Sequence, residues 1–255
     1  MKKTLLVSGC SNTEHNFYSD IHPTLDCSWP KWPELLAKKL DMDCVNLAKS
    51  GQGNEYIYTT LLEYITRNDK SKIGLVIPAW TQNQRRDYQK FNSWNSKRID
   101  SEGDIFFWTR KHLDYCLSFQ ILCERYNLPY IQVQMLSSFQ NWMDGLKPGD
   151  NDKRYPPKFR HIYPGDVPKD KIVIAKLITG YEDLINTKRF IGWPLTYEFG
   201  GFNLQQQLIS QEQDTMLSKE DSHPNAKGQE KIAEFIYDRL GWRIFSKQRR
   251  VFKNL

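Results

Sequence analysis

Several patterns that mark whole classes of protein are missing from this sequence. No apolar run approaches the roughly 20 residues of a membrane-spanning helix. The five cysteines are odd in number and lack C-x-x-C spacing, which argues against a disulfide framework and predicts reduced, mostly buried thiols. The histidines show no metal-ligand spacing with cysteines or carboxylates. We therefore expect neither a metal nor a cofactor.

A strong excess of one charge is also missing. The formal charge is +6 over 255 residues, and the basic residues are dispersed except near the C-terminus. This balance argues against a nucleic-acid partner. Residues 241–255 form a basic tail that also carries apolar side chains. This mixed composition is more typical of a tail that docks on the sheet or on a neighbouring subunit than of an arm that binds nucleic acid. Both interpretations stay open.

The N-terminus imitates a lipoprotein signal, with two lysines followed by Val7-Ser8-Gly9-Cys10. Only residues 4–8 could serve as its apolar region, and such signals need about 7 to 15 residues. We therefore predict a cytoplasmic protein without a membrane span. Export by another route stays open.

Short apolar runs alternate with amphipathic segments along the chain. The predicted strands are residues 4–7, 43–47, 73–80, 129–135 and 189–193, and the predicted helices are residues 32–40, 56–65, 105–126, 172–185 and 229–240. This alternation predicts a three-layer α/β/α sandwich around a mostly parallel sheet of about five strands. Pro78 lacks a ladder donor and should mark the end of the third strand.

The length and composition favour a single domain over residues 1–240. The hydrophobic fraction is only 39%, but 13 Phe, 13 Tyr and 8 Trp supply large apolar side chains for a core. Two polar stretches, near 88–104 and 142–169, are typical of surface insertions.

A nucleophile, a base and a carboxylate stand at opposite ends of the chain. Ser11 follows the first predicted strand, and Asp221-Ser222-His223-Pro224 precedes the last predicted helix. A serine hydroxyl needs a histidine to take its proton and a third group to orient that histidine. Because parallel strands end at one edge of a sheet, the two segments can meet in one site.

Four segments resemble the SGNH hydrolases, also called GDSL-type esterases and lipases. The first is Gly9-Cys10-Ser11-Asn12-Thr13, and the second is Asn46 followed five residues later by Gly51. The family's last block falls on Asp221-Ser222-His223-Pro224, and Trp32-Pro33-x-x-Leu36 is similar to a further common segment of the family. Each match is weak alone, and the order of the four carries the resemblance.

The resemblance implies a flavodoxin-like fold and a role for each matching residue. Ser11 would be the nucleophile, His223 the base and Asp221 the group that orients it. The backbone amides of Ser11 and Gly51 would stabilise the oxyanion.

Two departures from the family pattern concern the oxyanion donor and the first block. The family's third block, G-x-N-D, carries an asparagine donor, but here the third strand ends Ala79-Trp80-Thr81-Gln82-Asn83. Thr81 takes the nearest position, and Asn54 or Asn83 could substitute from a loop. Cys10 replaces the aspartate of the first block, where burial is more typical than a role as nucleophile.

Other interpretations of these residues stay open. Ser11 could be a turn serine, and Asp221-Ser222-His223-Pro224 could simply begin a helix. Glu220 competes with Asp221 as the carboxylate.

Substrate contacts are expected near the end of the third strand. Arg85 and Trp80 are the candidates, Arg85 for an anionic group, although a solvated pair of Arg85 and Arg86 is the more typical arrangement. Three further tryptophans could stack on sugar or lie in the core: Trp94, Trp108 and Trp142.

The sequence therefore predicts a serine hydrolase that cleaves an ester, with an O-acetyl or short acyl group on carbohydrate as the expected substrate. The alternative is a catalytically weakened protein of the same fold that serves in binding or assembly. The oligomeric state is not defined by the sequence.

Overall fold

The computed structural model describes residues 2–139, 167–196, 199–210 and 212–243. Its elements, in chain order, are β1 Thr4–Ser8, α1 Trp32–Lys39, β2 Asp43–Asn46, α2 Asn54–Arg67, η1 Lys70–Lys72, β3 Ile73–Trp80, β4 Arg86–Lys90, β5 Ser93–Lys97, α3 Ile105–Arg125, β6 Gln132–Gln134, α4 Val167–Glu182, η3 Thr187–Arg189, β7 Phe190–Ile191, η5 Gln205–Ile209, η6 Gln213–Thr215 and α5 Ala226–Arg243. Every strand and helix expected from the sequence is present, with boundaries that differ by a few residues.

The central sheet has five parallel strands in the order β2-β1-β3-β6-β7. This order corresponds to the flavodoxin-like 2-1-3-4-5 arrangement, which confirms the expected fold class. The chain leaves β1 toward β2 on one side and returns to β3 on the other. Ser11 and Thr81 follow these two strands, so they lie at the reversal of strand order, where open α/β sheets place their sites.

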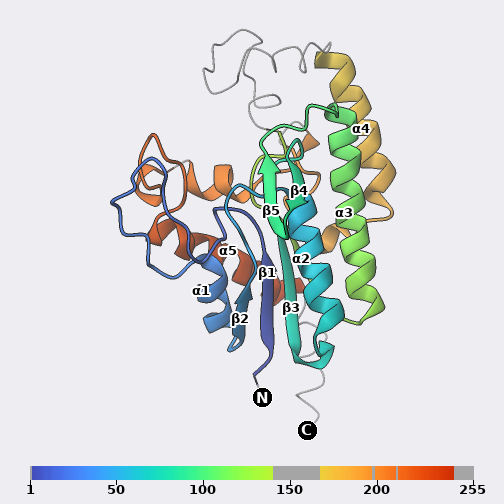
Figure 1. The fold of residues 1–255 in the computed structure, drawn as a ribbon. Coiled ribbons are helices and arrows are strands. Elements are labelled where there is room, and N and C mark those ends of the chain that lie inside the picture. Colours follow the sequence, from blue (N-terminus) through green and yellow to red (C-terminus); the bar gives the residue numbers. More distant parts are fainter. Residues whose placement is uncertain (1, 140–166, 197–198, 211, 244–255) are drawn as a thin grey trace.

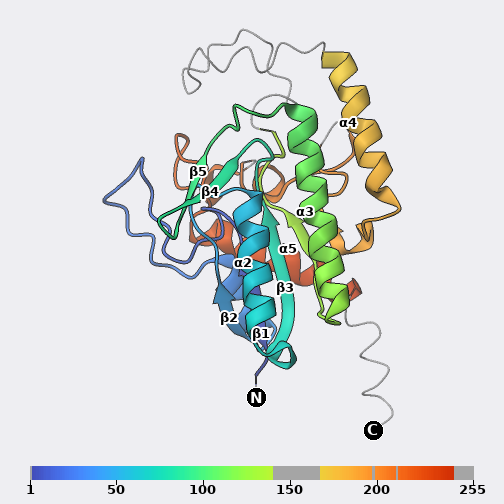
Figure 2. The ribbon, with the colours of Figure 1, turned by 45° about the vertical axis from the view of Figure 1, so that its right-hand side comes forward.

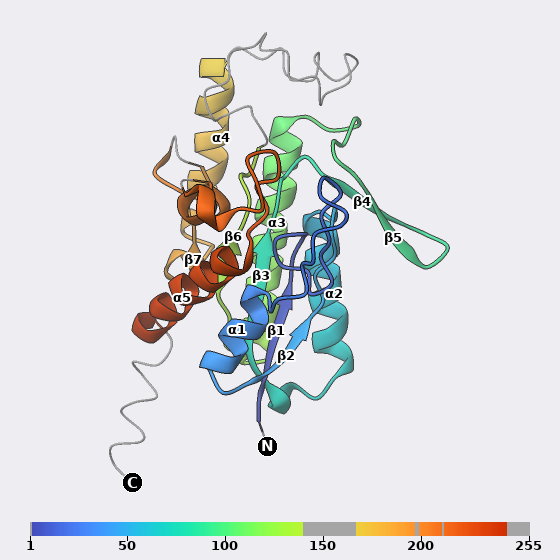
Figure 3. The ribbon, with the colours of Figure 1, turned by 90° about the vertical axis from the view of Figure 1, so that its left-hand side faces the viewer.

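Helices cover both faces of the sheet. Helices α1 and α5 pack on one face, against Leu5, Val7 and Ile77. The other face, which includes Leu6 and Val76, packs against α2, α3 and α4. Figure 3 shows α1 and α5 on one side of the sheet and α2 on the other. The alternation of residues 5, 6 and 7 between two cores is the expected pattern for a strand buried on both faces.

The expectation that Pro78 ends the third strand is wrong. Strand β3 continues to Trp80. Pairing with β1 ends at the Ser8–Pro78 pair, and pairing with β6 begins at Ala79–Val133. On that same side an isolated parallel bridge, Val76–Tyr130, comes before the proline, so Pro78 stands between two points of pairing and its missing N–H does not end the strand.

The polar stretch near 88–104 contains most of an antiparallel hairpin, formed by β4 and β5 outside the main sheet (Figure 2). The insertion expected near 142–169 and the tail at 241–255 lie almost entirely outside the described residues. All five cysteines are free, and four of them are buried.

Candidate active site

The chain turns sharply at the end of β1 and exposes Ser11. The backbone amides of Thr13 and Glu14 both donate to the carbonyl of Cys10, at 2.9 and 3.0 Å, so a helical turn begins directly after the strand. Cys10 is fully buried and Asn12 is 1% exposed, whereas Ser11 is only half-buried. Ser11 is therefore the side chain of this turn that reaches the surface, and Cys10 occupies the core.

The structure brings Ser11, His223 and Asp221 into one hydrogen-bonded chain. Ser11 Oγ lies 2.8 Å from His223 Nε2, and His223 Nδ1 lies 2.5 Å from Asp221 Oδ1. Because an ionised carboxylate only accepts, Nδ1 carries the proton and Nε2 is left to accept the serine hydroxyl. This is the tautomer that general-base chemistry requires. The catalytic roles themselves stay a prediction.

Asp221 is buried and fully engaged. Its second oxygen, Oδ2, accepts a hydrogen bond from Ser19 Oγ at 2.5 Å, and Oδ1 also accepts the His223 backbone amide at 3.1 Å. Burial acts to raise the pKa of Asp221, but the hydrogen bonds from Ser19 and His223 outweigh it and hold that pKa below the usual 3.8. Asp221 is therefore an ionised carboxylate, while Glu220 is exposed.

Residues 14–31, between β1 and α1, contribute to this side of the site. Phe17 lies against the His223 ring with centroids 4.5 Å apart, and Ser19 holds Asp221. His22 Nε2 lies 2.8 Å from Ser218 Oγ. Figure 1 shows this dark-blue segment beside the orange segment that leads to α5. The residues between 14 and 31 form no motif with a recognisable spacing, so the sequence offered no signal for them.

The predicted oxyanion donors Ser11 and Gly51 have unused backbone amides. Among the described residues, neither N–H has a hydrogen-bond acceptor. Gly51 is exposed, has φ +77°, and has open space on the side where a Cβ would stand. A backbone in this region favours glycine. The two amides are thus available, and their role stays a prediction.

The loop that carries Gly51 is fastened to the start of β4. The Asp87 carboxylate accepts the backbone amides of Gly53 at 2.7 Å and Tyr56 at 2.8 Å, and so caps the N-terminus of α2. A Cβ on Gly53 would lie 2.8 Å from Arg85 Cβ and 2.9 Å from an Asp87 oxygen. Glycine at position 53 is therefore what permits this close approach.

Arg85, a candidate for binding an anionic substrate, contacts this loop instead. Its Nη1 donates to the Gln52 carbonyl at 2.8 Å, and its Nε donates to Gln82 Oε1 at 3.1 Å. The guanidinium therefore holds the loop in place in this structure.

Asn54, one of the candidate side-chain donors for the oxyanion, is already engaged in hydrogen bonds. Asn54 accepts from the Thr81 amide at 2.8 Å and donates to the Thr81 carbonyl at 3.2 Å. Its other N–H is directed at His112 Nδ1, at 3.1 Å. Burial lowers the pKa of His112 to about 3, so this ring is neutral and Nδ1 accepts. Both N–H groups of Asn54 are therefore used, and the expectation that Asn54 donates to an oxyanion is wrong for this arrangement.

Thr81 and Asn83 differ from Asn54. Both are buried, and neither the Thr81 hydroxyl nor the Asn83 side-chain amide has a partner among the described residues. The Asn83 backbone is fixed by its amide, which donates to the Ser138 carbonyl at 2.8 Å. Asn83 is therefore the candidate amide whose N–H groups remain unused.

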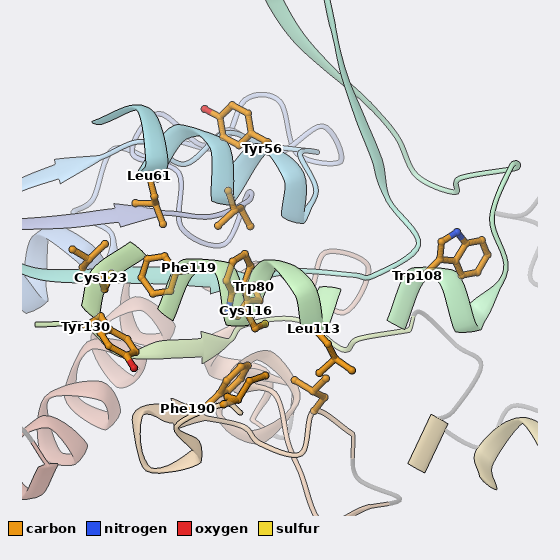
Figure 4. Packing of buried hydrophobic residues seen from close by; sticks show 14 of the residues in the cluster. Tyr56, Leu61, Trp80, Trp108, Leu113, Cys116, Phe119, Cys123, Tyr130 and Phe190 are labelled. Atoms are coloured by element: carbon orange, nitrogen blue, oxygen red, sulfur yellow. The ribbon is translucent and has the colours of Figure 1, made fainter. Parts of the chain in front are cut away.

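The expectation that Trp80 binds substrate is wrong. Its side chain is fully buried, donates from Nε1 to Gln132 Oε1 at 2.9 Å, and packs edge-on against Phe119 (Figure 4). Its position at the end of β3 suggested exposure, but the side chain points into the core between the sheet and α3. Trp108 is also buried, Trp94 is half-buried against Tyr56, and Trp142 lies outside the described residues.

Two searches of the described part of the chain gave negative results. It holds no cluster of three or more histidine, cysteine, aspartate or glutamate side chains placed to bind a metal ion. None of its helices combines the length and the apolar character needed to cross a membrane.

Comparison with known proteins gave similarity only at the level of structure. No family model matches the sequence, and no curated protein matches it. The esterase EstA from Pseudoalteromonas sp., in a structure inhibited by monoethylphosphonate, is 13% identical and aligns over 94% of this chain and 97% of its own, with a TM-score of 0.49. TesA is 15% identical over 93% and 98%, with a TM-score of 0.49. The acetyl xylan esterase AlAXEase is 12% identical over 94% and 99%, with a TM-score of 0.42. At these identities and TM-scores the likeness carries no argument about activity, which rests on the site itself.

Proposed function

We propose that this chain is a serine esterase of the SGNH type that removes an O-acetyl or other short acyl group from carbohydrate. The observation that supports this most is the hydrogen-bonded chain from Ser11 Oγ to His223 Nε2 at 2.8 Å and from His223 Nδ1 to Asp221 Oδ1 at 2.5 Å. Its members sit at the carboxyl edge of the sheet, on loops from opposite ends of the sequence.

The reaction would proceed in two halves. Ser11 Oγ bonds to the acyl carbon while its proton passes to His223, and the carbohydrate alcohol then leaves with that proton. Water then attacks the acyl carbon of the acyl-serine and gives a proton to His223, which passes it to Ser11 Oγ as the acyl–oxygen bond breaks and the acid is released. Asp221 stabilises the imidazolium in both halves, and the Ser11 and Gly51 amides would face the oxyanion. Of the three tryptophans considered for stacking on sugar, Trp94 is the half-buried one within the described residues.

Turnover of p-nitrophenyl acetate and release of acetate from acetylated oligosaccharides test this proposal. We expect both activities in the wild type and their loss in Ser11→Ala and His223→Ala. A wild type no faster than His223→Ala on either substrate would rule the esterase out. Activity on p-nitrophenyl acetate alone would reject only the carbohydrate.

A second candidate function is that of a catalytically weakened binding or assembly protein. It is supported by the lack of a side-chain donor for the oxyanion at the usual position. The usual third-block asparagine is missing, and Asn54 cannot replace it because both of its N–H groups are used. This candidate predicts binding of acetylated oligosaccharide without turnover.

A further inference from the structure

Both oxygens of Asp221 are held, and they are held from different parts of the chain. Oδ1 faces His223, two residues away, whereas Oδ2 accepts Ser19 Oγ from the segment between β1 and α1. Ser19 is 1% exposed, so water does not compete for its hydroxyl. Its oxygen also accepts the His22 backbone amide at 3.0 Å. Since the carboxylate can only accept, the single hydroxyl proton of Ser19 must go to Asp221.

A second serine fixes the segment that carries Ser19. Ser218 Oγ accepts the backbone amides of Glu220 at 3.1 Å and Asp221 at 3.0 Å. Its own proton is therefore left for His22 Nε2, 2.8 Å away, which makes this nitrogen of His22 an acceptor. His22 thus contacts Ser19 through its backbone and Ser218 through its ring. The loop that carries Ser19 and the loop that carries Asp221 are therefore joined at two points, Ser19–Asp221 and His22–Ser218.

We propose that Ser19 is a positioning residue for the Asp221–His223 pair, with His22 and Ser218 holding it in place. A carboxylate held through one oxygen can turn about its terminal torsion, while one held through both cannot. Ser19 thereby keeps Oδ1 directed at His223 Nδ1 and keeps the imidazole in the tautomer that accepts from Ser11. This role rests on the proposed esterase function for its kinetic consequence, but its geometric consequence can be measured without any substrate.

Ser19→Ala tests the proposal, with Ser8→Ala as the matched control. Ser8 is another fully buried serine, and its hydroxyl pairs with Thr60 Oγ1 at 2.8 Å, away from Asp221. We expect Ser19→Ala to lower kcat about ten- to a hundredfold with little change in KM, since it removes a hydrogen bond to a charged group. We also expect the far-downfield proton resonance of His223 Nδ1–H to broaden or vanish. Ser8→Ala should leave both readouts as in the wild type, and Ser19→Thr, which keeps the hydroxyl, should restore much of both.

Three results would overturn the proposal. They are unchanged kcat and resonance in Ser19→Ala, equal losses in Ser8→Ala and Ser19→Ala, and absence of the downfield resonance from the wild type. If Ser19→Ala does not fold, Ser19→Cys fills the same space with a weaker donor, and full kcat and resonance in that variant would also reject the role. A wild type that shows the resonance but hydrolyses no ester refutes the esterase and leaves the positioning role intact.

Discussion

The two sides of the candidate site are built differently. On the acid–base side, Ser11, His223, Asp221 and Ser19 each have a partner within 2.8 Å. On the oxyanion side, the Ser11 and Gly51 amides are unused, and the Asn83 side chain is buried without a partner among the described residues.

The two sides therefore owe their geometry to different kinds of contact. The acid–base side holds itself together through its own side-chain hydrogen bonds and can be pre-formed in the free protein. The oxyanion side depends on a backbone loop that Asp87 and Arg85 hold from β4 and the turn before it. Substitutions on the first side should therefore alter chemistry, and those on the second should alter loop position.

The largest effect is expected from the acid–base side. We expect Ser11→Ala or His223→Ala to lower kcat for p-nitrophenyl acetate about 10⁴-fold or more, because each removes a member of one proton-transfer unit. The double variant should be no slower than either single one. His15→Ala, an exposed histidine, serves as control. Independent, multiplying losses in the double variant would show that the two residues do not act together.

Asn83 gives the next largest expected effect and tests the oxyanion side. We expect Asn83→Ala to lower kcat about 100-fold, as loss of one oxyanion donor does elsewhere. Its stability should change little through hydrogen bonding, since no described group loses a partner. Asn54→Ala should instead reduce the free energy of unfolding by about 3 kcal/mol, because it leaves the Thr81 backbone and His112 unpaired. Steady-state kinetics measures the change in kcat of both variants, and chemical denaturation measures the change in their free energy of unfolding. Full activity in Asn83→Ala would show that Asn83 does not act in the site.

A smaller effect is expected where the loop is fastened. Gly53→Ala places a Cβ within 3 Å of Arg85 and Asp87, so the loop that carries Gly51 must shift. We expect kcat/KM to fall about tenfold, as a catalytic group loses its alignment. Gly180→Ala, in α4 with open space around its Cα, should leave activity unchanged. Equal kcat/KM in the two variants would mean that the loop position does not matter for turnover.

The smallest expected effect is on the pH dependence of stability. Because the folded-state pKa of Asp221 is lowered, this carboxylate stabilises the fold above about pH 3.8, and the stabilisation is lost as the pH falls through the folded-state pKa. Relative to Asp221→Asn, the wild type should lose free energy of unfolding only in that acid range. Urea titrations at a series of pH values measure the difference, and a gap that stays constant into acid would show that the pKa is not lowered.

The sequence was enough to expect that Ser11, His223 and Asp221 lie together, because the signals for them are local. Asp221 and His223 are two residues apart, and Ser11 directly follows a buried strand. Parallel strands then bring these ends to one edge without further information. The alternation of apolar runs and helical segments was enough to predict a mostly parallel sheet, whereas the flavodoxin-like arrangement was implied by the family resemblance.

What the sequence did not reveal depends on contacts between distant residues. Ser19 and Asp221 are 202 residues apart, and the pairing of Gly53 with Asp87 joins a loop to a hairpin strand. Trp80 was misjudged because the direction of a side chain at a strand end is set by the packing of α3, not by its neighbours in sequence. Pro78 was misjudged because the strand is held on both sides of the proline by pairing with a segment more than 50 residues later.

Fluorophosphonate labelling followed by mass spectrometry of the digested protein tests the central claim most directly, because this reagent reacts much faster with a serine whose proton a base removes. We expect one adduct, on Ser11, in the wild type and none in His223→Ala. No adduct on Ser11 in the folded wild type, or an equal adduct in His223→Ala, would contradict the account.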